Sequence, residues 1–290
     1  MDARDFLNTP IPEYEEGKIL EKIYELQKQL IDGYVKIEGL PPYPIDVNPK
    51  KSQILIKDFV GRVIEELAEG YESLILIDKL CRKNLNFVYN YDDVDLGQCI
   101  NHLQNVSEEM ADAMHFMVEL LIYVNIQPDD ILKYINKHFS ESSLDLIPTK
   151  DRSNTIRMAM YYGKSVLTKE NDLSTMYTGI NLLRLTDFEY ETKSLLYQAG
   201  HLYDAELYND FKKCLWDVAY HLNIARNFLK NKPWKQSQMM TDELNFQREI
   251  VEGFIAMMGA FYIIGIDDTT LYAIYFWKHE ANLFRQNSKY

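Results

Sequence analysis

The sequence predicts an all-α protein, a helical bundle made of two similar halves. Apolar residues recur every three or four positions along most of the chain, which is the period of an amphipathic helix. No segment sustains the period-two alternation of a half-buried strand, and the β-branched residues do not cluster. With 290 residues, 47% of them hydrophobic, the chain is long enough to bury a substantial core. These observations favour a helical bundle over a sheet-containing fold.

The first half is expected to hold four helices. Residues 1–17 are predicted to be an irregular leader, and residues 39–49 a loop with four prolines. Residues 81–98 are polar and aromatic without a steady period, and we interpret them as an insertion or lid. Ser107 is expected to be an internal helix start. Helices are predicted over residues 18–35, 52–80, 101–125 and 129–139, the last after a turn at 127–130.

The second half shows the same helical periodicity of apolar residues. Residues 140–153 are polar, contain Pro148 and are the best candidate for a linker. The chain is therefore divided into an N-terminal half, residues 1–145, and a C-terminal half, residues 146–290. Helices are predicted over residues 153–167, 172–185, 188–202, 205–229, 241–264 and 271–287.

One stretch of the first half is similar to one of the second, which predicts an internal duplication. Residues 110–138 and 250–279 each run through a long apolar helix to a turn containing Asp-Asp. Each stretch then ends in Tyr-x-x-Lys-His. This ending matches Tyr134, Lys137 and His138 with Tyr275, Lys278 and His279.

Two helices of the first half carry acidic residues three positions apart. Glu66 and Glu69 form one pair, and Glu109 and Asp112 form the other. Positions i and i+3 share a helix face, so two such helices side by side would direct four carboxylates at one place. Four charges in an apolar setting are costly unless a cation neutralises them. Mg²⁺ prefers oxygen ligands completed by substrate phosphates, so the pattern predicts a magnesium site that Mn²⁺ could also occupy.

The second half carries an incomplete version of these acids. Glu249 and Glu252 echo the second acidic pair, whereas Asp217 and Tyr220 stand about where the first pair would be. The second half does keep a basic and amide-rich end. We therefore expect a degenerate repeat that has no working site of its own and supplies phosphate-binding residues to the acids of the first half.

Composition excludes several kinds of protein. The net charge of −13 and the pI near 5.0 argue against broad binding to nucleic acid or to anionic membranes. The three cysteines lack C-x-x-C spacing, which argues against a zinc site or a disulfide framework and favours a reducing cytoplasm. The N-terminus has no signal-peptide core, and the longest apolar runs are too short to span a membrane.

The acidic pattern resembles the signature of a known superfamily. Glu65, Glu66 and Glu69, followed by Glu109 and Asp112, resemble the two acidic motifs of the all-α NTP pyrophosphohydrolases. That superfamily includes the MazG-like proteins and the dimeric dUTPases. It pairs equivalent subunits or repeats, so the resemblance implies a monomeric pseudo-dimer or a homodimer.

Two further stretches look more narrowly like the dimeric dUTPases. The ending YFWKHEANLFRQ is similar to the end of those enzymes, and ELQKQL, which contains Gln27, resembles their first helix. Two features depart from the family pattern. The interval between Glu69 and Glu109 is longer than usual, and the aromatic, lysine-rich segment after the first motif is not clear.

The resemblance implies hydrolysis of dUTP to dUMP and pyrophosphate. Mg²⁺ would be held by Glu66, Glu69, Glu109 and Asp112, and Glu66 would also orient the attacking water. The residues implied to bind the nucleotide come from both ends of the chain: they are Gln27 for the base, Lys278 and Arg285 for the phosphates, and Asn282 for a phosphate or the sugar.

Other functions stay open at this point. A MazG-like hydrolase of another nucleotide, such as dCTP or a modified pyrimidine nucleotide, would share these motifs. A non-catalytic helical interaction protein could use the acidic face to bind a partner. A di-iron bundle needs Glu-x-x-His on two helices, and only Asp112 and His115 approach that pattern. His115 is expected to lie in the core or to support the metal ligands rather than to bind metal.

Overall fold

The protein is helical throughout the part of the chain that its computed structural model describes. These residues are 3–14, 18–83, 93–138, 205–231, 239–263, 266 and 268–288. Within them there is no strand. The elements are the 3₁₀ helix η1 (Ala3–Phe6) and the helices α1 (Ile19–Ile37), α2 (Lys50–Lys83), α3 (Asp93–Tyr123), α4 (Pro128–His138), α8 (Ala205–Phe228), α9 (Glu243–Ile263) and α10 (Asp268–Ser288).

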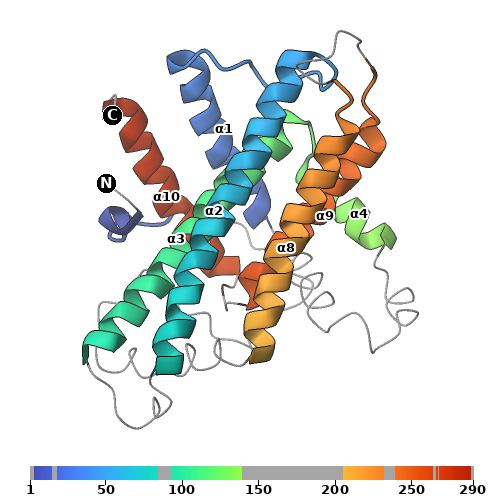
Figure 1. The fold of residues 1–290 in the computed structure, drawn as a ribbon. Helices are drawn as coiled ribbons and strands as arrows, with labels where there is room; N and C mark the ends of the chain where they lie inside the picture. Colours follow the sequence, from blue (N-terminus) through green and yellow to red (C-terminus); the bar gives the residue numbers. More distant parts are fainter. Residues whose placement is uncertain are drawn as a thin grey trace.

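A four-helix bundle forms the centre of the molecule. Helix α2 packs along α3, and α8 packs along α9 (Figure 1). The two pairs meet where α2 contacts α8 and α3 contacts α9. Both pairs are antiparallel, as the colour gradient in Figure 1 shows. Their facing sides bury aliphatic, methionine and aromatic side chains in one continuous core, which is the packing expected of amphipathic helices.

A second layer covers one side of the bundle. Helix α10 lies against α1, α3 and η1, and α1 also contacts α3. Gly33 allows α1 to approach α10, because a Cβ there would lie 2.2 Å from Oε1 of Gln286. The Gln286 amide instead donates a 2.9 Å hydrogen bond to the carbonyl of Leu30. The C-terminal helix is thereby placed beside the first helix and beside α3.

A buried polar cluster joins the loop before α2 to the connection between α8 and α9. The side-chain nitrogen of Gln53 donates to Thr241 Oγ1 at 2.9 Å, and its side-chain oxygen accepts from the backbone N–H of Asn231 at 2.9 Å. Asn231 in turn donates to the carbonyl of Asn48 at 2.7 Å. These three hydrogen bonds join residues that are 178 to 188 positions apart in the chain, so the cluster fixes one helix pair against the other.

The seven helices predicted within the described residues are confirmed, with ends that differ by at most three positions except for the start of α3, which lies eight positions earlier than predicted. The expectation for Ser107 is wrong: it lies inside α3, and its hydroxyl donates to the Leu103 carbonyl at 3.3 Å. The leader contains η1, whose Ala3 is buried, because it packs against α10. The residues 81–98 interpreted as a lid are partly helical, since α2 runs to Lys83 and α3 begins at Asp93.

Several predictions fall outside the described residues. They include the linker at 140–153, the boundary between residues 145 and 146, and the helices over 153–167, 172–185 and 188–202. The division into two equivalent halves therefore stays a prediction. No helix in the described part of the chain combines the length and the apolar character needed to cross a bilayer.

Candidate active site

The acidic residues of α2 and α3 meet where the two helices run side by side. Glu66, Glu69 and Glu109 each offer a carboxylate oxygen, and these oxygens lie within 4.8 Å of one another. Gly70 faces Glu109 across the helix contact, and a Cβ at Gly70 would lie 3.4 Å from the Glu109 Cβ. The predicted convergence of acids from two helices is thus present for three of the four carboxylates.

Crowding of like charges makes this cluster hard to ionise. Burial, followed by the charges of Asp112 and Glu109, raises the pKa of Glu66 to about 8. Burial, followed by the charges of Asp112 and Glu69, also raises the pKa of Glu109. The Glu66 and Glu109 side chains share a hydrogen bond, which requires a proton on one of them. The cluster therefore offers oxygen ligands and uncompensated negative charge, both of which suit a hard divalent cation.

The fourth acid, Asp112, is held by a buried lysine. The Lys278 ammonium lies 2.6 Å from Asp112 Oδ2 and 3.4 Å from Glu108 Oε1. The side chains of Lys278 and Glu108 are only 5% and 9% exposed. Burial raises the pKa of Asp112, while the Lys278 charge opposes that rise. The lysine predicted to bind phosphate is therefore engaged by two acids of α3, and its contact with phosphate stays a prediction.

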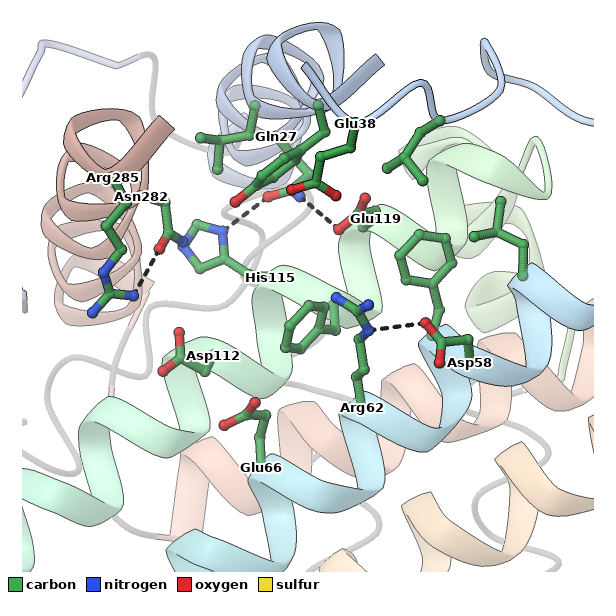
Figure 2. Close-up of a pocket in the computed structure, with 16 residues that line it drawn as sticks. Gln27, Glu38, Asp58, Arg62, Glu66, Asp112, His115, Glu119, Asn282 and Arg285 are labelled. Atoms are coloured by element: carbon green, nitrogen blue, oxygen red, sulfur yellow. Dashed lines mark hydrogen bonds and ion pairs between the residues drawn. The ribbon is translucent and has the colours of Figure 1, made fainter. Parts of the chain in front are cut away.

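A cavity of about 340 Å³ extends from the acids toward α1, a size typical of small-molecule sites. Glu66 and Asp112 lie at one end, and Gln27, Glu38 and Glu119 lie at the other, with His115 between (Figure 2). Asn282 and Arg285 of α10 line one side, and Arg285 donates to Asn282 Oδ1 at 3.3 Å. The rest of the wall consists of Arg62, which donates to Asp58 Oδ2 at 3.0 Å, and of apolar and aromatic side chains: Leu30, Tyr34, Leu40, Leu55, Phe59 and Phe116.

The far end of the cavity is built on the Gln27 amide, which is 1% exposed. Its Oε1 accepts a 2.6 Å hydrogen bond from the Tyr275 hydroxyl and lies 2.9 Å from His115 Nδ1. Its Nε2 donates to Glu119 Oε2 at 3.4 Å. Burial raises the pKa of Glu119 to about 7. The predicted base-binding residue thus lies at the cavity, but all its polar atoms already contact protein groups.

The structure brings seven of the eight predicted site residues to the cavity or to the acidic cluster, and places Lys278 next to them through Asp112. Sequence reasoning missed Glu119, Arg62 and Glu108. A signal for Glu119 was available, because Asp112, His115 and Glu119 have the i, i+3, i+7 spacing of one helix face. Glu108 gave no comparable signal, since its partner belongs to α10.

The matching acids of the second half have protein partners instead. Glu249 accepts from Arg248 Nη2 at 2.8 Å and lies 2.9 Å from His221 Nδ1. Glu252 accepts a hydrogen bond from the Tyr134 hydroxyl of α4. These partners lower the pKa of Glu249, the reverse of the shift at Glu109. The α9 acids are thus held by an arginine, a histidine and a phenol, whereas the acids of α2 and α3 face one another.

Comparison with known proteins gives one match. The profile of a family described as dUTPase matches residues 98–290, which is more than half of the chain. This range contains Glu109, Asp112 and the α10 residues of the cavity, whereas Gln27 and the acids of α2 precede it. No curated protein and no solved structure matches the chain significantly. Because the match covers most of the sequence, the chain belongs to the dUTPase family.

Proposed function

We propose that the protein is a Mg²⁺-dependent nucleotide pyrophosphohydrolase that converts dUTP and water to dUMP and pyrophosphate. One observation carries the proposal: Glu66 belongs both to the cluster of three carboxylates and to the wall of the cavity of about 340 Å³. Asn282 and Arg285 of α10 line one side of the same cavity. Acids for a metal and donors for phosphate thus face one space.

The residues present fit a hard divalent cation. Glu66, Glu69 and Glu109 offer only oxygen ligands, and the raised pKa of Glu66 reflects negative charge that a cation would offset. Asp112 adds a fourth carboxylate close enough to influence Glu66. A bound Mg²⁺ or Mn²⁺ supplies positive charge that offsets the phosphate charges and makes a nearby water more acidic.

The remaining steps belong to side chains of this chain. Glu66 is proposed to accept a hydrogen bond from the attacking water and so to orient it toward the α-phosphate. Arg285 is proposed to bind phosphate oxygens with its planar guanidinium, and Asn282 to hydrogen-bond a phosphate or the sugar. Lys278 holds Asp112 in place and would reach a phosphate only by releasing one of its carboxylates.

The preference for dUTP rests on the family and on the position of Gln27. We place the base at the end of the cavity lined by Gln27 and Glu119, next to His115. A related hydrolase of dCTP would use the same acids. We also propose a pseudo-dimer whose two halves meet near residues 145 and 146, in a cytoplasmic protein.

Release of pyrophosphate from each common dNTP and NTP in the presence of Mg²⁺ tests the proposal. We expect dUTP to be the best substrate and chelation to abolish turnover. Glu66→Gln should lower turnover at least about 100-fold, by analogy with other losses of a catalytic acid–base group. Glu72→Gln is the matched control, because Glu72 is exposed on the same helix. Hydrolysis of no nucleotide would refute catalysis and favour an interaction protein, whereas equal rates for the two variants would refute the catalytic role of Glu66.

A further inference from the structure

The base end of the cavity contains an amide whose orientation is dictated by its neighbours. Above its pKa of about 7, Glu119 is a carboxylate that can only accept hydrogen bonds, so the group of Gln27 that faces it is then the amide nitrogen. The Tyr275 hydroxyl lies 2.6 Å from the other end of the amide and donates to its oxygen. Both contacts select the same orientation. Burial keeps the pKa of Tyr275 well above its usual value, so this phenol retains its proton.

The amide orientation in turn fixes the tautomer of His115. Gln27 Oε1 lies 2.9 Å from His115 Nδ1 and cannot donate, so Nδ1 must carry the ring proton. Burial holds the pKa of His115 well below its usual value, which leaves the ring neutral. The imidazole also stacks on the Tyr275 ring, with centroids 3.9 Å apart and an interplanar angle of 16°. Position, rotation and protonation of His115 are therefore all set by protein contacts.

The remaining ring nitrogen, Nε2, is a buried acceptor. It has no hydrogen-bond partner among the described residues, although His115 lines the cavity. An unpaired buried polar atom lowers the stability of the folded state, and such atoms usually have a partner. A ligand in the cavity can supply that partner.

We propose that His115 Nε2 reads the base of the substrate by accepting a hydrogen bond from its ring N–H. The inference rests on the proposed function and names the substrate class. Uracil and thymine carry a proton on ring nitrogen 3, whereas cytosine presents a lone pair there and donates only from its exocyclic amino group. A fixed acceptor at this place selects imide pyrimidines and disfavours dCTP. Gln27 is then a positioning residue, which orients His115 instead of contacting the base.

The tautomer and its use are tested directly by ¹⁵N NMR of histidine-labelled protein at pH 8 in the presence of Mg²⁺. His115→Asn identifies the His115 resonances. We expect Nδ1 protonated and Nε2 unprotonated in the free protein. Saturating dUMP should move the Nε2 resonance upfield, as accepting a hydrogen bond requires, and dCMP should not. A proton on Nε2 in the free protein, or equal responses to dUMP and dCMP, would overturn the inference.

Substrate selectivity gives an independent readout. His115→Asn keeps a donor near Gln27 but removes the acceptor at Nε2, so it should lower the ratio of kcat/KM for dUTP over dCTP at least tenfold, a change of about 1.4 kcal/mol. Glu119→Gln, which frees the Gln27 amide to rotate, should lower the ratio in the same direction. Glu72→Gln should leave it unchanged.

The two proposals fail in distinguishable ways. If the wild-type protein hydrolyses no nucleotide, the proposed function fails. If it hydrolyses dUTP but His115→Asn and Glu119→Gln keep the wild-type ratio, the reading by His115 is wrong while catalysis stands. Should His115→Asn not fold, Glu119→Gln and the wild-type spectra decide the question.

Discussion

Replacing Lys278 with methionine isolates the contribution of the buried ion pair. Methionine has a similar length and no charge, so Asp112 and Glu108 would lose the cation that lies 2.6 and 3.4 Å from them. Removing one partner of a buried pair costs about 3–5 kcal/mol, because the remaining charge is left uncompensated. We expect a loss of that size in the free energy of unfolding at pH 8, since Lys278 faces two carboxylates and is 4% exposed.

The loss should depend on pH in a defined direction. Without the lysine, the largest opposition to the burial that raises the pKa of Asp112 is lost, and only the weaker effect of the Arg285 charge remains, so that pKa should rise further. A carboxyl with a raised pKa in the folded state takes up a proton more readily than in the unfolded state, so folding is favoured as the pH falls. The difference between wild type and Lys278→Met should therefore shrink between pH 8 and pH 5.

Urea unfolding followed by circular dichroism, with a chelator present, measures both effects. Lys137→Met is the matched control, because Lys137 is the residue that the predicted duplication matches with Lys278 and is exposed. That variant should stay within about 0.5 kcal/mol of wild type at every pH. If Lys278→Met is no less stable than Lys137→Met, or if its deficit grows as the pH falls, the ion-pair reasoning is refuted.

Three further predictions concern the metal, the second half and the polar cluster. Because burial and neighbouring acids raise the pKa of Glu66 to about 8, Mg²⁺ must displace a proton from Glu66 at lower pH. Calorimetry should therefore show proton release on Mg²⁺ binding, and an Mg²⁺ affinity that weakens by up to about tenfold per pH unit from pH 8 to 6. An affinity that does not change with pH would contradict this. Glu249→Gln should keep pyrophosphate release within about twofold of wild type, whereas Glu109→Gln should lose most of it; equal losses would mean that the second half also works. Asn231→Ala should lower the free energy of unfolding in urea by about 1–3 kcal/mol, since it leaves buried partners unpaired. Asn227→Ala, at an exposed residue, should leave that free energy nearly unchanged. Equal losses for the two variants would show that the cluster does not hold the helix pairs together.

The helices could be predicted because each depends on local periodicity. The stripe over residues 18–35 and the long run over 52–80 both correspond to observed helices, α1 and α2. The internal start at Ser107 could not be judged the same way. A serine at a helix start and a serine inside a long helix look alike in sequence, and packing against α2 decided for the interior.

The acids were predictable for a related reason, since i, i+3 spacing on two helices is visible in the sequence. What each acid faces was not. The spacing was compatible with Asp112 joining the other three carboxylates, but in the folded structure Asp112 is ion-paired with Lys278 of α10. The same holds for Gln27, whose three polar contacts come from α3 and α10. Contacts between helices that are distant in sequence produce no regular residue spacing, so they could not be predicted from the sequence.

Helix α3 connects the two kinds of chemistry at this site. It carries Glu109 for the acidic cluster, Asp112 for the lysine, and His115 and Glu119 for the base end. Asp112 and Glu119 are seven residues apart, which is about 10 Å along a helix. This separation is set by hydrogen bonds within one helix, and not by a loop or a domain closure. Because a helix resists stretching, a base seated against His115 and Glu119 places its phosphates at a fixed distance from the acids. Under the proposed function, selection of the base and selection of the bond to be cleaved are then one geometric requirement, so substitutions at His115 should impair turnover as well as selectivity.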